Sequence, residues 1–311
     1  MSCKVVGIGE ALWDLLPAGR QLGGAPANFA YHAKMLGADS QIVTRIGHDA
    51  DGKGIARRFE DMGIRIDTVQ VDDRRPTGTA TVLGGNGASP KFIINDNVAW
   101  DFLEPTEEAE QAARAADAVC FGTLAQRHHA SGSVIRRLVA SAPPEALRVF
   151  DVNLRQQFYN REVIEQSLQI ANVLKLNDQE LPVLGAMFDL HGPVGGQIEQ
   201  LGAKFSLRIV ALTRGPQGSL LYQAGNWSEL PGRTVAVVDT VGAGDSFTAG
   251  LVMGLLAGMN LNEVHRLAAD IAAFVCSQPG ATPALPGHFR AALAAYFGLP
   301  RTLAKPVRAS A

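Results

Sequence analysis

The clearest chemical pattern in the sequence is Asp-Thr-Val-Gly-Ala-Gly-Asp-Ser-Phe at 239–247, between an apolar run and an apolar helical stretch. A glycine turn lets backbone approach a ligand, and the free N–H groups and dipole of a helix start favour an anion. We therefore predict that Gly242, Ala243 and Gly244 form an anion hole for phosphate. No Lys-Ser/Thr follows as in a Walker A motif, and Phe247 replaces the last glycine of a dinucleotide fingerprint.

Asp245 distinguishes this segment from other anion-binding turns. A carboxylate beside an anion hole repels a bound phosphate, so its presence needs a compensating role. It would have one if it accepted the proton of a hydroxyl that attacks a transferred phosphoryl group. The alternative is an early-helix acid that only complements the helix dipole.

A second pattern, Gly-Gly-Ala-Pro-Ala-Asn-Phe-Ala, begins at Gly23 and Gly24 and leads into a helix that ends near Leu36. Paired glycines bring backbone close to a ligand, and Asn28 offers both a donor and an acceptor to a hydroxyl. The alternative for Asn28 is a hydrogen bond to backbone near the helix start.

The elements that must position these residues alternate between short β-branched runs and helical patterns, which predicts an α/β fold with a mostly parallel sheet and helices on both faces. Nearly continuous apolar runs such as RIVAL indicate strands buried on both sides. The expected strands are 4–8, 41–45, 118–121, 147–151, 173–177, 207–212 and 234–238, and the expected helices are 26–36, 52–62, 131–140, 162–171, 178–184 and 244–256.

Four polar residues stand at the carboxyl ends of expected strands, where ligands of open α/β sheets bind. They are Asp151, Asn177, Thr213 and Asp239. We therefore expect them to share one surface with the anion hole.

Two segments break the alternation, because residues 77–102 contain strand patterns joined by a glycine-rich turn and residues 12–22 form a similar short insertion. We expect both to form a small β-lid inserted into a single domain of residues 1–300. Residues 301–311 are expected to be a C-terminal tail. The lid would expose apolar Val82, Phe92 and Ile94, and a ribbon of this kind needs covering, so we expect a homodimer.

Composition excludes several classes of function. The 28 Lys and Arg against 30 Asp and Glu give a net charge of −2, with no basic field for nucleic acid or an anionic membrane. Cys3, Cys120 and Cys276 form no CxxC pair, which suits a reducing, cytoplasmic compartment. The start lacks the pattern of a signal peptide, and the apolar stretch 248–259 is too short to span a bilayer. We expect a small-molecule partner.

At this point GGAPANFAYHAKMLG (23–37) and DTVGAGDSFTAG (239–250) resemble the two signature segments of the PfkB, or ribokinase-like, carbohydrate kinases. The resemblance extends from GIGEALWDLLP near the start to QPGATPALP near the end. It implies a ribokinase-like three-layer α/β/α fold and phosphorylation of a sugar by ATP with Mg²⁺.

The resemblance also implies roles for individual residues. Asp245 matches the general base, and Asp14, Gly23, Gly24 and Asn28 match positions around the sugar. The element Asn177-Asp-Gln-Glu180 is similar to the family's NxxE, in which Asn and Glu organise Mg²⁺ and phosphate largely through water. The turn with Thr213, Gly215 and Gly218 resembles the one beside the nucleotide. Asp239, with backbone near Val241 and Gly280, falls where some members bind a monovalent cation such as K⁺, although Ala284 removes a hydroxyl ligand there.

The sugar is less sharply indicated. Three segments look most like the fructokinase branch, with 2-keto-3-deoxygluconate kinases close behind: GGAPANFAYHAKMLG at 23–37, FGTLAQR at 121–127 and Asp-Val-Asn-Leu-Arg at 151–155. Arg127 or Arg155 could pair the carboxylate of an acidic sugar. Arg155 could equally face nucleotide phosphates, which would suit fructose. Ala25-Pro26 stands where ribokinases typically carry Lys-Gly, so ribose is disfavoured.

Other interpretations are weaker. A Rossmann dehydrogenase would use Gly7 and Gly9, but Leu12 stands at the third glycine. A sugar sensor would keep the pocket and lose the base, whereas Asp245 is present. The pair His128-His129 lacks a third metal ligand. The loop 47–52 lacks the Glu of an EF-hand, so we predict a turn and helix N-cap there, and it also resembles a family loop near the sugar.

Overall fold

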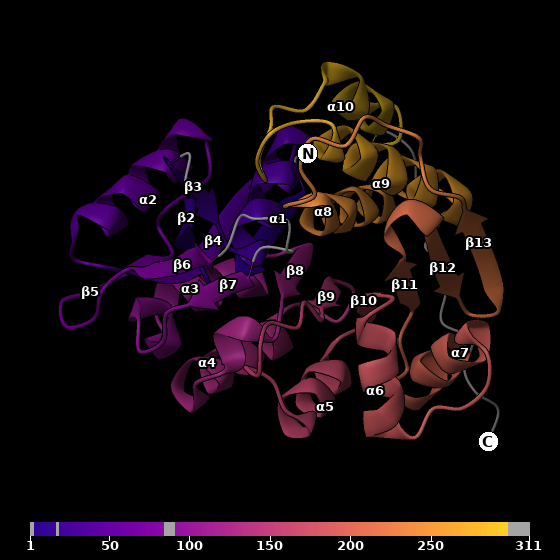
Figure 1. Cartoon of the computed structure of the whole chain (residues 1–311), viewed down its shortest axis with the longest axis horizontal. Coiled ribbons are helices and arrows are strands. Elements are labelled where there is room, and N and C mark those ends of the chain that lie inside the picture. Colours follow the sequence, from indigo (N-terminus) through magenta and orange to yellow (C-terminus); the bar gives the residue numbers. More distant parts are fainter. Residues whose placement is uncertain (1–2, 17–18, 84–90, 298–311) are drawn as a thin grey trace.

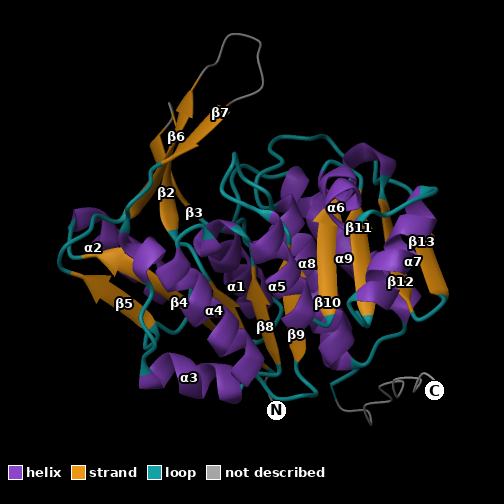
Figure 2. Cartoon of the chain, turned by 90° about the horizontal axis from the view of Figure 1, so that it is seen from below, coloured by secondary structure: helices purple, strands orange, loops and turns teal. Residues whose placement is uncertain are grey.

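The computed structural model describes residues 3–16, 19–83 and 91–297, and within them a nine-stranded sheet forms the centre of the molecule (Figures 1 and 2). Its strand order is β13-β12-β11-β10-β9-β8-β1-β4-β5. Every neighbouring pair from β11 to β5 is parallel, while β12 and β13 add an antiparallel hairpin at one edge. The strands are β1 Lys4–Ile8, β4 Asp39–Gly47, β5 Val69–Asp72, β8 Ala118–Phe121, β9 Leu147–Asp151, β10 Val173–Asn177, β11 Ile209–Thr213, β12 Ser219–Gln223 and β13 Asn226–Leu230.

Helices cover both faces of this sheet, as the sequence predicts (Figure 1). Alternate residues of the strands therefore belong to different apolar cores: Val5 is part of the core that includes α1, α8, α9 and α10, whereas Val6 is part of the core that includes α3 to α7. A smaller core joins α1 and α2 around Phe59. The helices are α1 Ala25–Met35, α2 Ala50–Asp61, α3 Glu107–Arg114, α4 His129–Ser141, α5 Arg161–Ile170, α6 Glu180–Phe188, α7 Val194–Lys204, α8 Ala243–Ala257, α9 Leu261–Cys276 and α10 Gly287–Ala294.

The strand expected at 234–238 does not form, so this prediction is wrong. Among the described residues this segment pairs with neither sheet, because its backbone N–H groups find another partner. It runs instead past the end of α9, where the backbone N–H groups of Val238 and Asp239 donate to the Cys276 carbonyl. Val237 and Val238 are consequently 64% and 62% exposed.

The two inserted segments meet in one four-stranded sheet, in the order β3-β2-β6-β7. Its strands are β2 Leu12–Leu16, β3 Gly19–Gly23, β6 Gly78–Leu83 and β7 Lys91–Ile94. Figure 2 shows the β6–β7 hairpin projecting from the side of the main sheet at which the parallel strands end. This small sheet therefore lies beside the edge where a ligand of an α/β sheet binds.

The small sheet corrects one expectation about exposure. Ile94 is 7% exposed and belongs to the core cluster of Leu12 and Trp100. Because side chains alternate along a strand, its neighbour Ile93 faces outward and is 46% exposed. The side chains of Val82 and Phe92 lie outside the described part of the structure.

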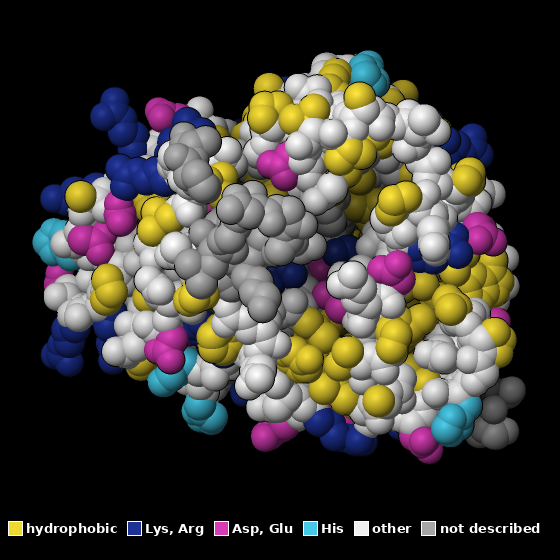
Figure 3. Space-filling view, in the orientation of Figure 1, with side chains coloured by type: hydrophobic (Ala, Val, Ile, Leu, Met, Phe, Trp, Pro, Cys, Tyr) yellow, Lys and Arg dark blue, Asp and Glu magenta, His cyan; other side chains and the backbone are white. Residues whose placement is uncertain are grey.

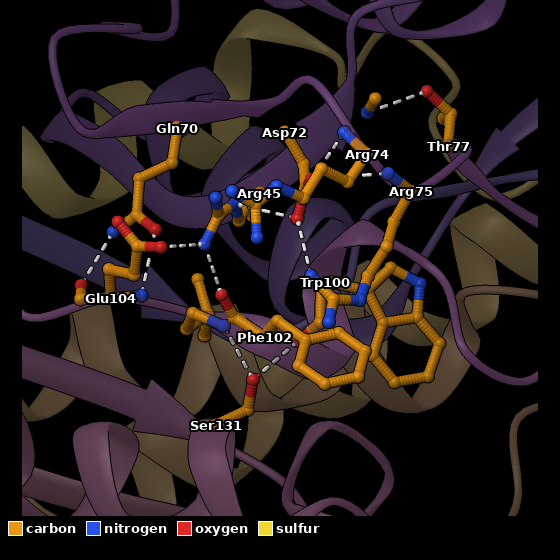
Figure 4. Close-up of polar contacts among 12 residues, drawn as sticks. Arg45, Gln70, Asp72, Arg74, Arg75, Thr77, Trp100, Phe102, Glu104 and Ser131 are labelled. Atoms are coloured by element: carbon orange, nitrogen blue, oxygen red, sulfur yellow. Dashed lines mark hydrogen bonds and ion pairs between the residues drawn. The ribbon is translucent and has the colours of Figure 1, made fainter.

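A charged network fixes the base of the small sheet (Figure 4). The buried Asp72 carboxylate accepts from the backbone N–H groups of Arg74 and Arg75 and pairs with Arg45 at 3.2 Å. Arg45 also donates to the Phe102 carbonyl and, at 2.7 Å, to Glu104. Arg45 thus holds together the chain that enters β6 and the chain that leaves β7.

The described residues contain no helix long and apolar enough to cross a membrane. Cys3, Cys120 and Cys276 form no disulfide bond, and two of them, Cys3 and Cys120, are buried.

Candidate active site

Asp245 lies in the first turn of α8, whose N-cap is Gly242. Gly242 has a φ of 77°, and a Cβ at this position would come within 2.5 Å of the Ala281 carbonyl oxygen, so only glycine fits. The tight turn leaves the N-terminal N–H groups of α8 beside a partly exposed Asp245. The predicted anion hole and its neighbouring acid are therefore part of one helix start.

The Asn28 side chain joins the two glycine-rich segments. Asn28 lies in α1, and its Nδ2 donates to Asp245 Oδ2 at 2.8 Å. The side-chain N–H of Asn28 therefore bonds to Asp245, and the alternative of a hydrogen bond to nearby backbone is wrong. Its Oδ1 is buried without a hydrogen-bond partner in the described structure, which leaves an acceptor next to Asp245.

The charge state of Asp245 is finely balanced. Burial, followed by the nearby Asp151 carboxylate, raises the pKa of Asp245 to about 6, while Asn28, Lys175 and Arg155 oppose that rise. A carboxylate with a pKa just below neutrality is ionised at pH 7 yet basic enough to take a proton. These are the properties of a general base.

Asp14 and Arg155 come from different elements of the chain, yet their charges interact. Asp14 is on β2, and a Cβ on the paired strand at Gly23 would lie 2.2 Å from Asp14 Oδ2, so Gly23 makes room for this carboxylate. Burial raises the pKa of Asp14 to about 6, and Arg155 lowers it. Arg155 is exposed in the loop after β9. Gly24, which follows Gly23 in the chain, is the N-cap of α1.

The residues predicted for the nucleotide lie at the carboxyl ends of β10 and β11. Asn177 and Thr213 are register partners, and Gly215 and Gly218 shape the turn that follows β11. Asn177 Oδ1 accepts from the backbone N–H groups of Gln179 and Glu180, both at 2.9 Å. These contacts begin α6 at the sheet edge.

Glu180 is buried, and its two carboxylate oxygens accept from the backbone N–H groups of Leu154 and Asn177 at 2.9 and 2.8 Å. No group of three or more His, Cys, Asp or Glu residues in the described part of the chain could enclose a metal ion. Both carboxylate oxygens of Glu180 are thus engaged by backbone, and magnesium binding at this edge stays a prediction.

Asp239 connects two loops. Its carboxylate accepts from the backbone N–H groups of Val241 and Gly280 at 3.0 and 3.1 Å. The side chain of His32 holds the same region through the Ala281 carbonyl at 2.9 Å. Asp239 therefore braces the loops implied for a monovalent cation, and cation binding there stays a prediction.

Three residues of this region were missed by sequence reasoning: Glu10, Lys175 and Thr248. Glu10 follows β1, is buried, and accepts from the Ala25 backbone N–H at 3.2 Å. Lys175 interrupts an apolar strand buried on both sides, and that interruption was a signal that could have found it. Thr248 lies in an apolar helix and carried no such signal.

The remaining candidates have other partners. Arg127 forms a two-pronged ion pair with Asp101 at 2.7 and 2.8 Å and stacks against Trp100, which commits it to the protein interior. His128 is exposed and caps α4. Asp49 caps α2 through the Gly52 N–H at 2.7 Å, which confirms the predicted N-cap, and it also accepts from Thr77 at the start of β6.

Figure 3 shows acidic and basic side chains at the bottom of a recess near the middle of the face viewed in Figure 1.

Comparison with known proteins gives matches to a family and to individual relatives. Residues 18–287 match the pfkB family of carbohydrate kinases. The chain is 31% identical over 303 residues to a fructokinase of Klebsiella pneumoniae, covering 92% of this chain and 97% of that protein.

Two solved structures are similar over most of the fold. A sugar kinase of Pyrococcus horikoshii in complex with ATP matches with a TM-score of 0.77 and 25% identity, over 89% of this chain and 94% of that chain. A fructokinase variant of Vibrio cholerae, solved with fructose, ADP and potassium, matches with a TM-score of 0.78 and 24% identity, over 95% and 98% of the two chains. The ribokinase-like fold is therefore established.

Proposed function

The chain belongs to the pfkB family of carbohydrate kinases, and we propose that it transfers the γ-phosphoryl group of ATP to a hydroxyl of fructose, giving fructose 6-phosphate. The observation that carries this proposal is the meeting of Asn28 and Asp245 at the start of α8. This contact brings a hydroxyl-binding segment, a general base and an anion hole to one point.

The reaction needs a proton acceptor and a stabilised phosphoryl group. Asp245 takes the proton of the sugar hydroxyl as its oxygen attacks phosphorus. The N–H groups of the turn 242–244 hold the transferring group, and the bond from phosphorus to the ADP oxygen breaks. Asp14, Asn28 and the backbone at Gly23 and Gly24 orient the sugar.

ATP and Mg²⁺ are the proposed cofactors. Mg²⁺, when bound, neutralises charge on the phosphate oxygens. The edge formed by Asn177, Thr213, Gly215 and Gly218 would receive the nucleotide. Glu180 would orient water around the metal, and its buried, doubly hydrogen-bonded carboxylate supports an indirect role. We also propose that Asp239 supports a K⁺ site formed with nearby backbone.

Fructose is preferred because the chain is 31% identical over 303 residues to a fructokinase. The alternative is 2-keto-3-deoxygluconate, whose carboxylate would pair with Arg155. The electrostatic interaction of Arg155 with the Asp14 carboxylate supports this alternative, since Asp14 is a proposed sugar contact. A sugar sensor without catalysis is less compatible with Asp245 in the position of a base.

A substrate panel tests the proposal. Purified protein is assayed with ATP and Mg²⁺ against fructose, 2-keto-3-deoxygluconate and ribose, with product position read by nuclear magnetic resonance. We expect the highest kcat/KM for fructose, with phosphate on the 6-hydroxyl. Preference for the keto acid would select the alternative, and no transfer to any sugar would contradict kinase activity.

The same site suggests a setting for the protein. We propose a cytoplasmic enzyme, because three cysteines without a disulfide bond and ATP as donor suit a reducing interior. We propose that the small sheet acts as a lid over the sugar within a single domain of residues 1–300, and pairs with that of a second copy. Residues 301–311 lie outside the described structure. Neither nucleic acid nor membrane is a proposed partner.

A further inference from the structure

Lys175 occupies a costly place for a charge. It lies in the middle of β10, between β9 and β11, and is 5% exposed. Transfer of an ammonium group from water into a protein interior is unfavourable unless close partners compensate for it. A leucine or valine would suit the strand better, so the lysine needs a specific reason to be there.

The contacts of Lys175 lead to the start of α8. Its Nζ donates to Asp151 Oδ1 at 3.0 Å, and Asp151 Oδ2 accepts from Thr248 Oγ1 at 2.9 Å. Thr248 lies in the same helix as Asp245. A Cβ at Gly244 would stand 2.9 Å from Lys175 Nζ, so the ammonium lies against the first turn of that helix. A chain of polar contacts thus ties two central strands to the anion hole.

Lys175 is also the buried cation of an acidic cluster. Asp151, Glu180 and Asp245 each interact with its charge. Loss of that cation would raise the proton affinity of Asp245, which the proposed reaction uses ionised. The groups that act on Asp245 come from several elements and are Glu10, Asp14, Asp151, Arg155 and Lys175, together with the Asn28 amide.

We propose that Lys175 is a positioning residue for phosphoryl transfer, which holds the first turn of α8 through Asp151 and Thr248 and keeps Asp245 ionised near neutral pH. This inference rests on the proposed role of Asp245 as general base. The ammonium group acts through Asp245 and the helix start and does not itself take the substrate proton.

Two single substitutions with opposite charge effects test this role. Lys175→Met removes the cation and should move the acid limb of the kcat pH profile upward by about one unit. Asp151→Asn removes an anion beside Asp245 and should move the same limb downward. Both variants are assayed as full-length protein with saturating ATP, Mg²⁺ and the preferred sugar. Unchanged limbs, or shifts in the same direction, would overturn the proposal.

The double variant Lys175→Met/Asp151→Asn separates catalysis from folding. It removes both buried charges, so its melting temperature should exceed that of Lys175→Met, in which Asp151 is left unpaired. We expect the acid limb of the double variant to lie above that of Asp151→Asn. If restored stability also restores wild-type kcat at every pH, Lys175 has only a structural role. Should Lys175→Met fail to fold, the comparison of the double variant with Asp151→Asn still decides.

A reference variant separates this inference from the proposed function. If Asp245→Asn keeps wild-type kcat, the general-base assignment fails and the role of Lys175 fails with it. If Asp245→Asn loses activity but the Lys175 and Asp151 variants keep the wild-type acid limb, only the inference about Lys175 fails.

Discussion

Asn28 Nδ2 donates a 2.8 Å hydrogen bond to Asp245 Oδ2, although the two residues are 217 positions apart in the chain. Each residue lies near the start of a helix, and the two helices, α1 and α8, pack against each other. The amide stabilises the ionised form of Asp245 and fixes its orientation. A sugar hydroxyl bound there would meet a base that is already aligned.

Asp245→Asn keeps the shape of the side chain but removes the proton acceptor. We expect kcat to fall by roughly 10²- to 10⁴-fold, because the sugar hydroxyl then attacks without a general base. The dissociation constant for ATP should stay similar or fall slightly, since a negative charge beside the phosphates is lost. Steady-state kinetics and calorimetric titration measure both. Asp61→Asn changes an exposed residue of α2 and serves as the control, which should match wild type.

The acid limb of activity should follow the ionisation of Asp245. Its pKa of about 6 means that turnover is lost as pH falls through 6, because the protonated carboxyl cannot accept the proton. Asn28→Ala removes a hydrogen bond to the ionised form, so the limb should move upward by about one unit. A pH profile of kcat at saturating substrates measures this shift. An identical limb in both proteins would show that the Asn28 contact does not tune the base.

Glu180→Gln should raise the Mg²⁺ concentration needed for half-maximal activity. The amide removes negative charge near the metal and turns an NH₂ group toward a backbone donor, so we also expect about 1–3 kcal/mol of lost stability. Mg²⁺ titration of the rate and urea unfolding measure these effects separately. Glu162→Gln, which changes an exposed residue of α5, is the matched control. A wild-type Mg²⁺ titration in Glu180→Gln would contradict the metal assignment.

Glu10 should make the protein more stable in mild acid than near pH 8. Burial raises the pKa of Glu10 from 4.5 to about 7, so the folded state binds its proton more tightly than the unfolded state. The folded state is therefore favoured at low pH. The contribution of Glu10 protonation to the free energy of unfolding is lost as pH rises from about 4.5 through 7. Glu10→Gln should be stabilised relative to wild type at pH 8 by up to about 3 kcal/mol, and little at pH 4.5. Urea unfolding at both pH values tests this, and an equal difference at both would contradict it.

Static light scattering should give a dimer at micromolar concentration. If the small sheets of two copies pair, Ile93→Asp should give a monomer, because Ile93 is exposed on β7 and a buried carboxylate would oppose association. Val71→Asp on β5, outside the small sheet, provides the control and should stay dimeric. A wild-type monomer would refute pairing through the lid.

The sequence by itself determined the class of fold and the position of the glycine-rich helix start at 239–247. Alternating apolar strands and helical patterns, with glycines before Asp245, are local features, and local backbone preferences alone create a helix start of the kind that favours anions. The positions of Asn177 and Thr213 at strand ends also followed, because parallel strands end at a common edge.

Tertiary structure alone decided which side chains meet. The amide of Asn28 could have bonded to nearby backbone, and only the packing of α1 beside α8 turns it toward Asp245. The apolar segment 234–238 has the local pattern of a strand, but the Val238 N–H donates to the Cys276 carbonyl at the end of α9 and the segment joins no described sheet. In the sequence Lys175 is a single charge within an apolar strand. Its contact with Asp151 depends on the register of β9 and β10. Such contacts depend on free energies shared between distant segments, which no local pattern contains.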